Sequence, residues 1–235
     1  MKIFAISDVH GFYNEMIEAL DKAGFDSSNP NHLLVSCGDN FDRGPDAVKV
    51  YEYLNNMDNC VLVRGNHELL MRDCLMRGFS KFHDISNGTS DTIIQFGNKF
   101  FDGNPKREFT KACKAVSPIF KKFDDKMVNY FETAHYVFVH SYIPDTEDWR
   151  ICNDVQWEQA MWGNPFVSSM YYGVKNKTIV HGHFHTSYYW SQVNGTSEFG
   201  EDACFDICRH NGAIGLDACT AYTKKVNVLV VEDTF

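Results

Sequence analysis

The sequence lacks long hydrophobic runs and is poor in proline, with 6 prolines among 235 residues. Its longer apolar segments, such as 226–231, have the length of a strand, whereas a membrane-spanning helix needs about 20 consecutive apolar residues. Hydrophobic residues make up 44% of the chain and charged residues 23%, a balance typical of folded globular proteins. Integral membrane, collagen-like and largely disordered chains are therefore excluded.

Positive charge is also scarce. The chain has 22 Lys and Arg against 31 Asp and Glu, which gives a formal net charge of −9. Proteins that bind the nucleic-acid backbone usually carry a basic stripe, so we expect no nucleic-acid partner. An acidic protein that acts on an anionic substrate must place positive charge locally, and bound metal ions supply such charge.

The first residues lack the basic region, apolar stretch and cleavage site of a secretory signal peptide. We therefore expect a cytoplasmic protein with no membrane association. Its eight cysteines are widely spaced in a chain that is long enough to bury a core without disulfides, which favours free thiols.

One cysteine lies in a segment with a second possible interpretation. Residues 37–43 have the Cys-x5-Arg spacing of cysteine-dependent phosphatases. Asp39 and Asp42 lie inside this segment, and their carboxylates would repel both a phosphate and a thiolate. This disfavours a thiolate mechanism, and Cys37 is predicted to be a buried strand residue.

Strand-like and helix-like segments alternate in the first third of the chain. Their order is strand 2–7, helix 13–23, strand 33–36, helix 46–54, strand 60–63 and helix 67–76. This alternation is typical of a parallel sheet with helices on its faces. Residues 78–126 lack the alternation, and we expect a mostly helical insert that overhangs the site.

The second half of the chain is richer in strand-like segments. Strands are predicted at 135–139, 178–181, 204–208, 213–217 and 226–232. They suggest a second sheet packed on the first. Because no linker or repeat divides residues 1–235, we expect a single domain.

Polar side chains follow five of the predicted strands. They are Asp8 with His10, Asp39, Asn66 with His67 and Glu68, His140, and His183. Ligands of open α/β sheets bind beyond the carboxyl ends of the strands, so we expect these five loops to meet at one edge. Carboxylate, imidazole and amide groups form a mixed N/O ligand set, which suits Mn, Fe or Zn better than Mg or Ca.

These segments together resemble the calcineurin-like metallophosphoesterases. They are, in the order of that family, Ser7-Asp8-Val9-His10-Gly11, Gly38-Asp39-Asn40-Phe41-Asp42-Arg43-Gly44, Arg64-Gly65-Asn66-His67-Glu68, His140 and Gly182-His183. The Asp-Arg-Gly and Gly-Asn-His-Glu forms resemble the protein serine/threonine phosphatase branch, including its small bacterial and phage members, and the symmetrical diadenosine tetraphosphatases. The resemblance implies an α/β fold, a four-layer α/β/β/α sandwich of two mixed sheets flanked by helices.

The resemblance also implies two divalent metal ions. The first would be held by Asp8, His10 and Asp39, and the second by Asp39, Asn66, His140 and His183. Two cations about 3.5–4 Å apart need an anionic bridge, and the carboxylate of Asp39 can serve both. A hydroxide between the ions would attack phosphorus in line. We expect Mn²⁺, with an Fe/Mn pair or Zn as alternatives.

Several neighbouring residues have roles implied by the family. Arg43 would bind the phosphoryl oxygens, where its fork can make two parallel hydrogen bonds. His67, oriented by Asp42, would protonate the leaving alkoxide. Asn66 and Arg64 are further candidates for substrate binding.

Two residues outside the main motifs are also candidates for the site. His185 ends a Gly-His-x-His segment, in which the wider superfamily uses the last His as a ligand of the first metal. Such a histidine can also bond to a ligand rather than to the metal, and both roles stay open. Asp217 is predicted to cap a turn or to contact a metal ligand.

Two segments depart from the pattern of the phosphatase branch. Ser141-Tyr142 follows His140, where that branch usually has Gly-Gly. Trp162-Gly163-Asn164-Pro165 occupies the segment in which the branch commonly carries a second phosphate-binding Arg. In this alignment the second Arg is absent. Arg43 and the metals would then bind the phosphate, with help from Arg64 or a lysine.

We therefore predict a dinuclear metal-dependent phosphatase that hydrolyses phosphate monoesters, with phosphoserine and phosphothreonine in proteins or peptides as the leading substrates. The alternatives are a bis(5'-nucleosyl)-tetraphosphatase or an enzyme for another small phosphoester. A non-enzymatic alternative is a binding scaffold on a degenerate phosphoesterase fold, which the presence of every expected ligand type disfavours. The sequence determines neither the physiological substrate nor the native metal pair nor the oligomeric state.

Overall fold

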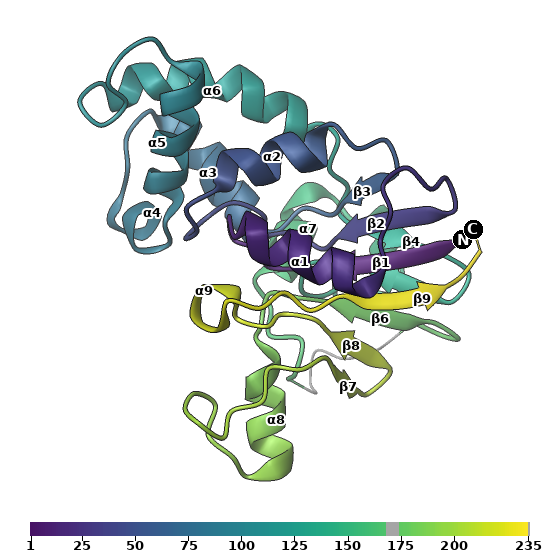
Figure 1. The fold of residues 1–235 in the computed structure, drawn as a ribbon. Coiled ribbons are helices and arrows are strands. Elements are labelled where there is room, and N and C mark those ends of the chain that lie inside the picture. Colours follow the sequence, from purple (N-terminus) through teal and green to yellow (C-terminus); the bar gives the residue numbers. More distant parts are fainter. Residues whose placement is uncertain (168–173, 235) are drawn as a thin grey trace.

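The computed structural model describes residues 1–167 and 174–234 (Figure 1). Its first sheet has the order β3-β2-β1-β9. The strands are β1 (Lys2–Ile6), β2 (His32–Ser36), β3 (Cys60–Leu62) and β9 (Leu229–Glu232). The first three run parallel, and β9 lies antiparallel beside β1, so this sheet is mixed.

The second sheet has the order β4-β5-β6-β8-β7. Its strands are β4 (Phe131–Glu132), β5 (Tyr136–Phe138), β6 (Thr178–His181), β7 (Cys208–His210) and β8 (Ala213–Gly215). β5, β6 and β8 run parallel, whereas β4 and β7 are antiparallel strands at the two edges. The carboxyl ends of its parallel strands therefore form one edge, as in the first sheet.

The alternation of side chains along β1 determines which surfaces pack together. Ile3 and Ala5 lie in the apolar cluster between the two sheets, together with residues of β5, β6 and β8. Phe4 and Ile6 point to the opposite face, where helices cover the first sheet. Both faces of this sheet are buried, which explains why its strands read as continuous apolar runs.

Helices cover the outer face of the first sheet. They are α1 (Tyr13–Ala23), α2 (Ala47–Asn55), α3 (Asn66–Arg77), α5 (Thr89–Phe100) and α6 (Phe109–Asp124). The short helix α4 (Phe82–Ser86) precedes α5. Helices α4, α5 and α6 fall within the predicted insert and stack beside α2 and α3 in Figure 1.

The outer face of the second sheet is covered by η1 (Trp149–Ile151) and α7 (Asp154–Met161), which contribute Trp149, Trp157 and Met161 to a third apolar cluster. The described residues also include the helices α8 (Thr186–Asn194) and α9 (Thr220–Thr223), which precede β7 and β9. The layers are thus α/β/β/α, and the predicted fold class is confirmed.

That residues 1–235 form one domain stays a prediction. Within 1–167 and 174–234, every helix is too short or too polar to cross a membrane.

One predicted strand is wrong. Residues 204–207 are irregular, and β7 begins only at Cys208. Phe205 packs its ring against Phe199 and Tyr222 instead of extending a strand, with ring centroids 6.1 and 5.7 Å apart. An apolar residue in a short segment can be buried by side chains as well as by a sheet, and periodicity does not distinguish the two cases.

Candidate metal centre

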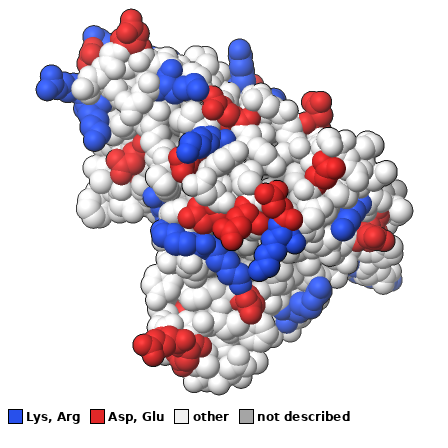
Figure 2. All heavy atoms as spheres, in the orientation of Figure 1, with Lys and Arg blue, Asp and Glu red and all other residues white. Residues whose placement is uncertain are grey.

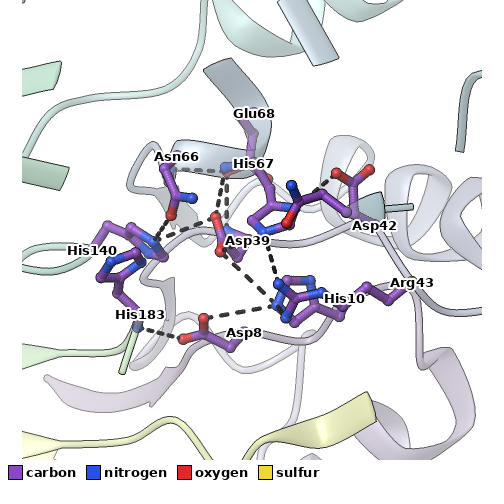
Figure 3. Close-up of polar contacts among 12 residues, drawn as sticks. Asp8, His10, Asp39, Asp42, Arg43, Asn66, His67, Glu68, His140 and His183 are labelled. Carbon is purple, nitrogen blue, oxygen red and sulfur yellow. Dashed lines mark hydrogen bonds and ion pairs between the residues drawn. The ribbon is translucent and has the colours of Figure 1, made fainter. Parts of the chain in front are cut away.

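Five loops meet at the carboxyl ends of the parallel strands (Figure 3). Asp8 and His10 follow β1, Asp39 follows β2, and His140 and His183 follow β5 and β6. Asn66 and His67 begin α3 after β3. The sheets thus bring together residues that are as far as 175 positions apart, such as Asp8 and His183, whose carboxylate and backbone N–H are hydrogen-bonded at 2.9 Å.

Asp39 lies between two groups of candidate metal ligands. One group is His10, Asp39 and His67, the other is Asp39, His140 and His183, and the ligand atoms of each group lie within 4.8 Å of one another. The two carboxylate oxygens face different groups. Oδ2 is 3.9 Å from His10 Nε2, and Oδ1 is 3.4 Å from His140 Nε2.

Asp8 and Asn66 extend these two groups on opposite sides. Asp8 Oδ1 is 4.0 Å from His10 Nε2, and Asn66 Oδ1 is 2.7 Å from His140 Nε2. The two sets of N and O donors therefore share one carboxylate, which is the arrangement that a pair of divalent cations requires.

The charges of the centre also fit bound cations. Burial, Asp217 and Asp39 raise the pKa of Asp8 well above its usual value. Burial also acts to raise the pKa of Asp39, but His140, His67, His10 and His183 outweigh it and lower this pKa. Cations between these carboxylates would remove the repulsion that acts on Asp8.

The backbone at the strand ends adopts a rare conformation. Asp8, His10, Asp39 and His183 have φ angles of 52°, 51°, 58° and 66°. This left-handed region costs roughly 1–2 kcal/mol for a residue with a side chain. Such conformations gather at functional sites, where the surrounding structure enforces them.

Two glycines allow the loops to approach closely enough. A Cβ atom at Gly182 would lie 1.8 Å from Ser7 Oγ and 2.1 Å from Asp8 Oδ2. A Cβ atom at Gly65 would lie 2.2 Å from Asp39 Oδ1. Both glycines are therefore required by the close contact of the loops.

Glu68 organises the loop that carries Asp39. Its carboxylate accepts hydrogen bonds from the backbone N–H groups of Asp39, Asn40 and Gly65 at 2.9–3.0 Å. Glu68 stands in the Gly-Asn-His-Glu motif, but no role was predicted for it. Its spacing of three residues from Gly65, the N-cap of α3, is the signal that could have revealed a capping carboxylate.

His67 and Asp42 form a buried pair beside Asp39. His67 Nδ1 donates to Asp42 Oδ2 at 2.7 Å, which leaves Nε2 facing the centre. Burial acts to lower the pKa of His67, but Asp39 and the hydrogen bond to Asp42 raise it above its usual value.

Two threonines of α5 fix Asp42. Thr89 Oγ1 donates to Asp42 Oδ2 at 2.5 Å, and Thr92 Oγ1 donates to Oδ1 at 2.7 Å. Neither threonine was predicted as part of the site, because nothing in the sequence pairs a threonine with an aspartate about 50 positions earlier.

Arg43 lies at the mouth of the centre and is exposed. Its guanidinium contacts His10 Nε2 at 2.8 Å and His67 Nε2 at 3.1 Å. It therefore brings a positive charge to the same side as His67.

Two residues that the sequence made candidates have partners of their own. Arg64 is hydrogen-bonded to Asp124 and Asn129. His185 Nε2 lies 3.0 Å from a carboxylate oxygen of Glu198. Their roles in substrate and metal binding stay predictions, and these contacts do not favour them.

Asp217 lies close to the centre and is buried. Its carboxylate accepts a hydrogen bond from the backbone N–H of Cys219 at 2.7 Å, which is the geometry of a turn cap. Burial raises its pKa to about 6. Asp217 also acts to raise the pKa of Asp8, while its contact with a metal ligand stays a prediction.

Cys37 is fully buried between the two sheets. Burial raises the pKa of its thiol, which opposes the thiolate that a cysteine-dependent phosphatase needs. All eight cysteines are free in the structure.

Residues 1–214 match the family described as calcineurin-like phosphoesterase. The chain belongs to the calcineurin-like phosphoesterase family. The predicted family resemblance is therefore confirmed, and a metal-dependent hydrolase agrees with this family.

Curated relatives match shorter segments. The symmetrical bis(5'-nucleosyl)-tetraphosphatase of Buchnera aphidicola is 31% identical over 97 residues, which cover 36% of this chain and 34% of that protein. The zinc-dependent endopolyphosphatase of Saccharomyces cerevisiae is 44% identical over 80 residues, which cover 33% of this chain and 24% of that protein. The chain thus matches about a quarter to a third of the length of these relatives.

A solved structure described as a candidate diadenosine tetraphosphatase has the same fold. Its TM-score is 0.63 at 14% identity, and the alignment covers 98% of this chain and 92% of that one. A cold-active protein tyrosine phosphatase aligns with a TM-score of 0.60 at 16% identity, covering 98% and 73%. At these identities the similarity concerns the fold alone.

Proposed function

We propose that this protein is a phosphohydrolase that uses two divalent cations and acts on a small phosphorylated molecule, with a dinucleoside polyphosphate as the leading candidate. The observation that carries the catalytic part is the position of Asp39, whose two oxygens face separate groups of N and O donors. Support for the substrate comes from the curated relatives, several of which are named symmetrical bis(5'-nucleosyl)-tetraphosphatase.

The proposed ligands are Asp8, His10, Asp39, Asn66, His140 and His183. When bound, the cations supply a water of lowered pKa and positive charge for the phosphoryl oxygens. Their identity is part of the proposal. The N/O donors suit Mn²⁺, Fe or Zn²⁺, and one relative is named zinc-dependent.

The remaining work falls to three side chains of the protein. Arg43 would donate two hydrogen bonds to the phosphoryl oxygens. His67 would carry a proton on Nε2 to the leaving oxygen, while Asp42 holds its Nδ1–H. The direction of the pKa shift of His67 supports this role, because Asp39 and the hydrogen bond to Asp42 favour its acid form.

The phosphoserine and phosphothreonine substrates predicted from the sequence have no specific support among the relatives, and we retain them as the competing outcome of a test. The experiment is a substrate panel with Mn²⁺: a dinucleoside tetraphosphate, inorganic tetrapolyphosphate, phosphopeptides, cyclic nucleotides and an aryl phosphate. Asp39→Asn is the inactive control.

We expect the dinucleoside tetraphosphate to have the highest kcat/KM. A higher kcat/KM for phosphopeptides would overturn the substrate proposal and leave the chemistry intact. A chelated sample that neither loses activity nor recovers it on addition of Mn²⁺ would instead favour the binding scaffold.

A further inference from the structure

An exposed tryptophan stands beside the metal centre. Trp162 follows the last residue of α7, and 47% of its surface is exposed. Its ring centroid lies 6.3 Å from that of His183, and the two ring planes are nearly perpendicular, at 87°. The indole therefore forms part of the rim next to His140 and His183.

The backbone of this tryptophan is tied to the loops of both histidines. The His183 imidazole donates a hydrogen bond to the Trp162 carbonyl. Ser141, which is fully buried and directly follows His140, donates from Oγ to the carbonyl of Gly163. The two departures from the family pattern, Ser141 and Trp162, thus belong to one arrangement.

A second aromatic ring faces the indole from the insert. His83 of α4 is exposed, and its ring centroid lies 6.1 Å from that of Trp162 at an interplanar angle of 43°. The rim between α4 and α7 therefore presents flat rings where the phosphatase branch commonly has an arginine.

We propose that Trp162 determines specificity by stacking on a nucleobase of the substrate. This inference rests on the proposed function and narrows its substrate to nucleoside phosphates. The face of an indole can stack on another flat ring, and stacking of a base on an aromatic side chain is worth about 1–3 kcal/mol. Because hydrogen bonds already hold the backbone of Trp162, little further ordering of this residue is needed when a substrate binds.

The same rim disfavours a phosphopeptide. Phosphoserine has no ring to stack on Trp162, and the neutral indole cannot replace the second arginine that would bind its single phosphate. In a nucleotide, a ribose joins the base to the phosphate. The structure likewise places an aromatic surface beside the metal ligands, so the base would lie on Trp162 while the phosphate lies at the centre.

The test compares two variants, Trp162→Ala and Trp162→Phe, on a matched pair of substrates. A dinucleoside tetraphosphate carries bases, and inorganic tetrapolyphosphate has the same phosphate chain without them. We expect Trp162→Ala to lower the ratio of kcat/KM between the two substrates by about 5- to 150-fold, chiefly through KM for the dinucleotide. Trp162→Phe should restore most of the ratio.

Phe79→Ala is the control, because Phe79 is also an exposed aromatic residue. Phe79 lies just beyond the C-terminal end of α3, whereas Asn66 is the first residue of this helix. A helix of 12 residues is about 18 Å long, so Phe79 is far from the metal ligands. We expect its ratio to equal that of the wild type. An unchanged ratio in Trp162→Ala, or an equal loss on both substrates, would overturn the inference while the proposed function stands. If the wild type hydrolyses neither compound, the proposed function itself fails.

Discussion

The residues at the strand ends combine an unusual backbone with unusual charges. Asp39 has a φ of 58°, is buried, and lies among four histidines that lower its pKa against the effect of burial. The left-handed backbone and the burial of the carboxylate each have a cost that other contacts must offset. We infer that both are retained because they aim one carboxylate at two cations.

His67 provides a test at this scale. We expect His67→Asn to slow hydrolysis of an alkyl phosphate by about 10²–10⁴-fold, because the leaving alkoxide then lacks its proton donor. An aryl phosphate, whose leaving group needs little protonation, should lose far less. The measurement is kcat for both substrates with saturating Mn²⁺. Equal losses would remove His67 from the role of acid.

Single residues were the most predictable part of the centre. Asp8, His10, Asp39, Asn66, His140 and His183 stand in short motifs directly after apolar runs, so their common edge follows from the strand order. The spacing of Glu68 from Gly65 indicates a cap of α3, but not its bonds to the Asp39 loop. Ser141 could not be assigned, because its partner belongs to a loop that approaches only in the folded chain.

At the scale of elements, α5 couples the helical insert to the metal centre. Thr89 and Thr92 lie one turn apart on its first turns and both donate to Asp42. Each carboxylate oxygen of Asp42 thus accepts a hydrogen bond from one threonine, and Oδ2 also accepts one from His67 Nδ1. The insert therefore positions the proposed acid, whereas its overhang of the centre stays a prediction.

This coupling predicts a shared effect on stability and catalysis. We expect Thr92→Val to lower the free energy of unfolding by about 1–3 kcal/mol, because a buried carboxylate oxygen loses its partner. It should also reduce kcat for alkyl phosphates more than for aryl phosphates. Thr110→Val is the matched control, since Thr110 lies in α6 of the same insert and its hydroxyl donates to the Gly78 carbonyl rather than to the centre. Identical kcat ratios in the two variants would contradict the coupling.

Elements with strong periodicity were predicted well, and those without it were not. The helix expected over 13–23 matches α1, whose Met16 and Leu20 are buried against the first sheet. Helices α7 and α8 went unrecognised. They are short, with 8 and 9 residues, and their burial is set by contacts with the second sheet rather than by a regular apolar face.

At the scale of the whole molecule, ion pairs join the second sheet to the helix that covers it. Glu132 of β4 forms ion pairs with Arg150 of η1 at 2.6 Å and with Lys177 at 2.9 Å. The hydrogen bond from Arg150 is the main cause that lowers the pKa of Glu132 to about 2.

The ion pairs of Glu132 predict how the stability of the protein depends on pH in acid. The pKa of Glu132 in the folded protein lies below its usual value of 4.5, so its contribution is complete above pH 4.5 and is lost as the pH falls toward 2. We expect wild type to exceed Glu132→Gln in free energy of unfolding by about 1 kcal/mol at neutral pH, a size set by partial exposure. Urea unfolding should show the difference shrink between pH 4.5 and 2. A constant difference would contradict the assignment.

The layered architecture followed from the sequence because strands buried on both faces form continuous apolar runs. The pairing of strands across the second sheet did not, since β4 to β8 have only two to four residues each. Segments this short fix neither order nor register without their neighbours. The meeting of Ser141 with Gly163, and so the position of Trp162, depends on that order.

The proposed chemistry depends on two cations that share Asp39. Anomalous diffraction from crystals grown with Mn²⁺ would locate these cations in the wild type and in Asp39→Asn. We predict two peaks about 3.5–4 Å apart on either side of the Asp39 carboxylate, and the loss of at least one in the variant. A single peak in the wild type, or two peaks that both persist without Asp39, would contradict the account.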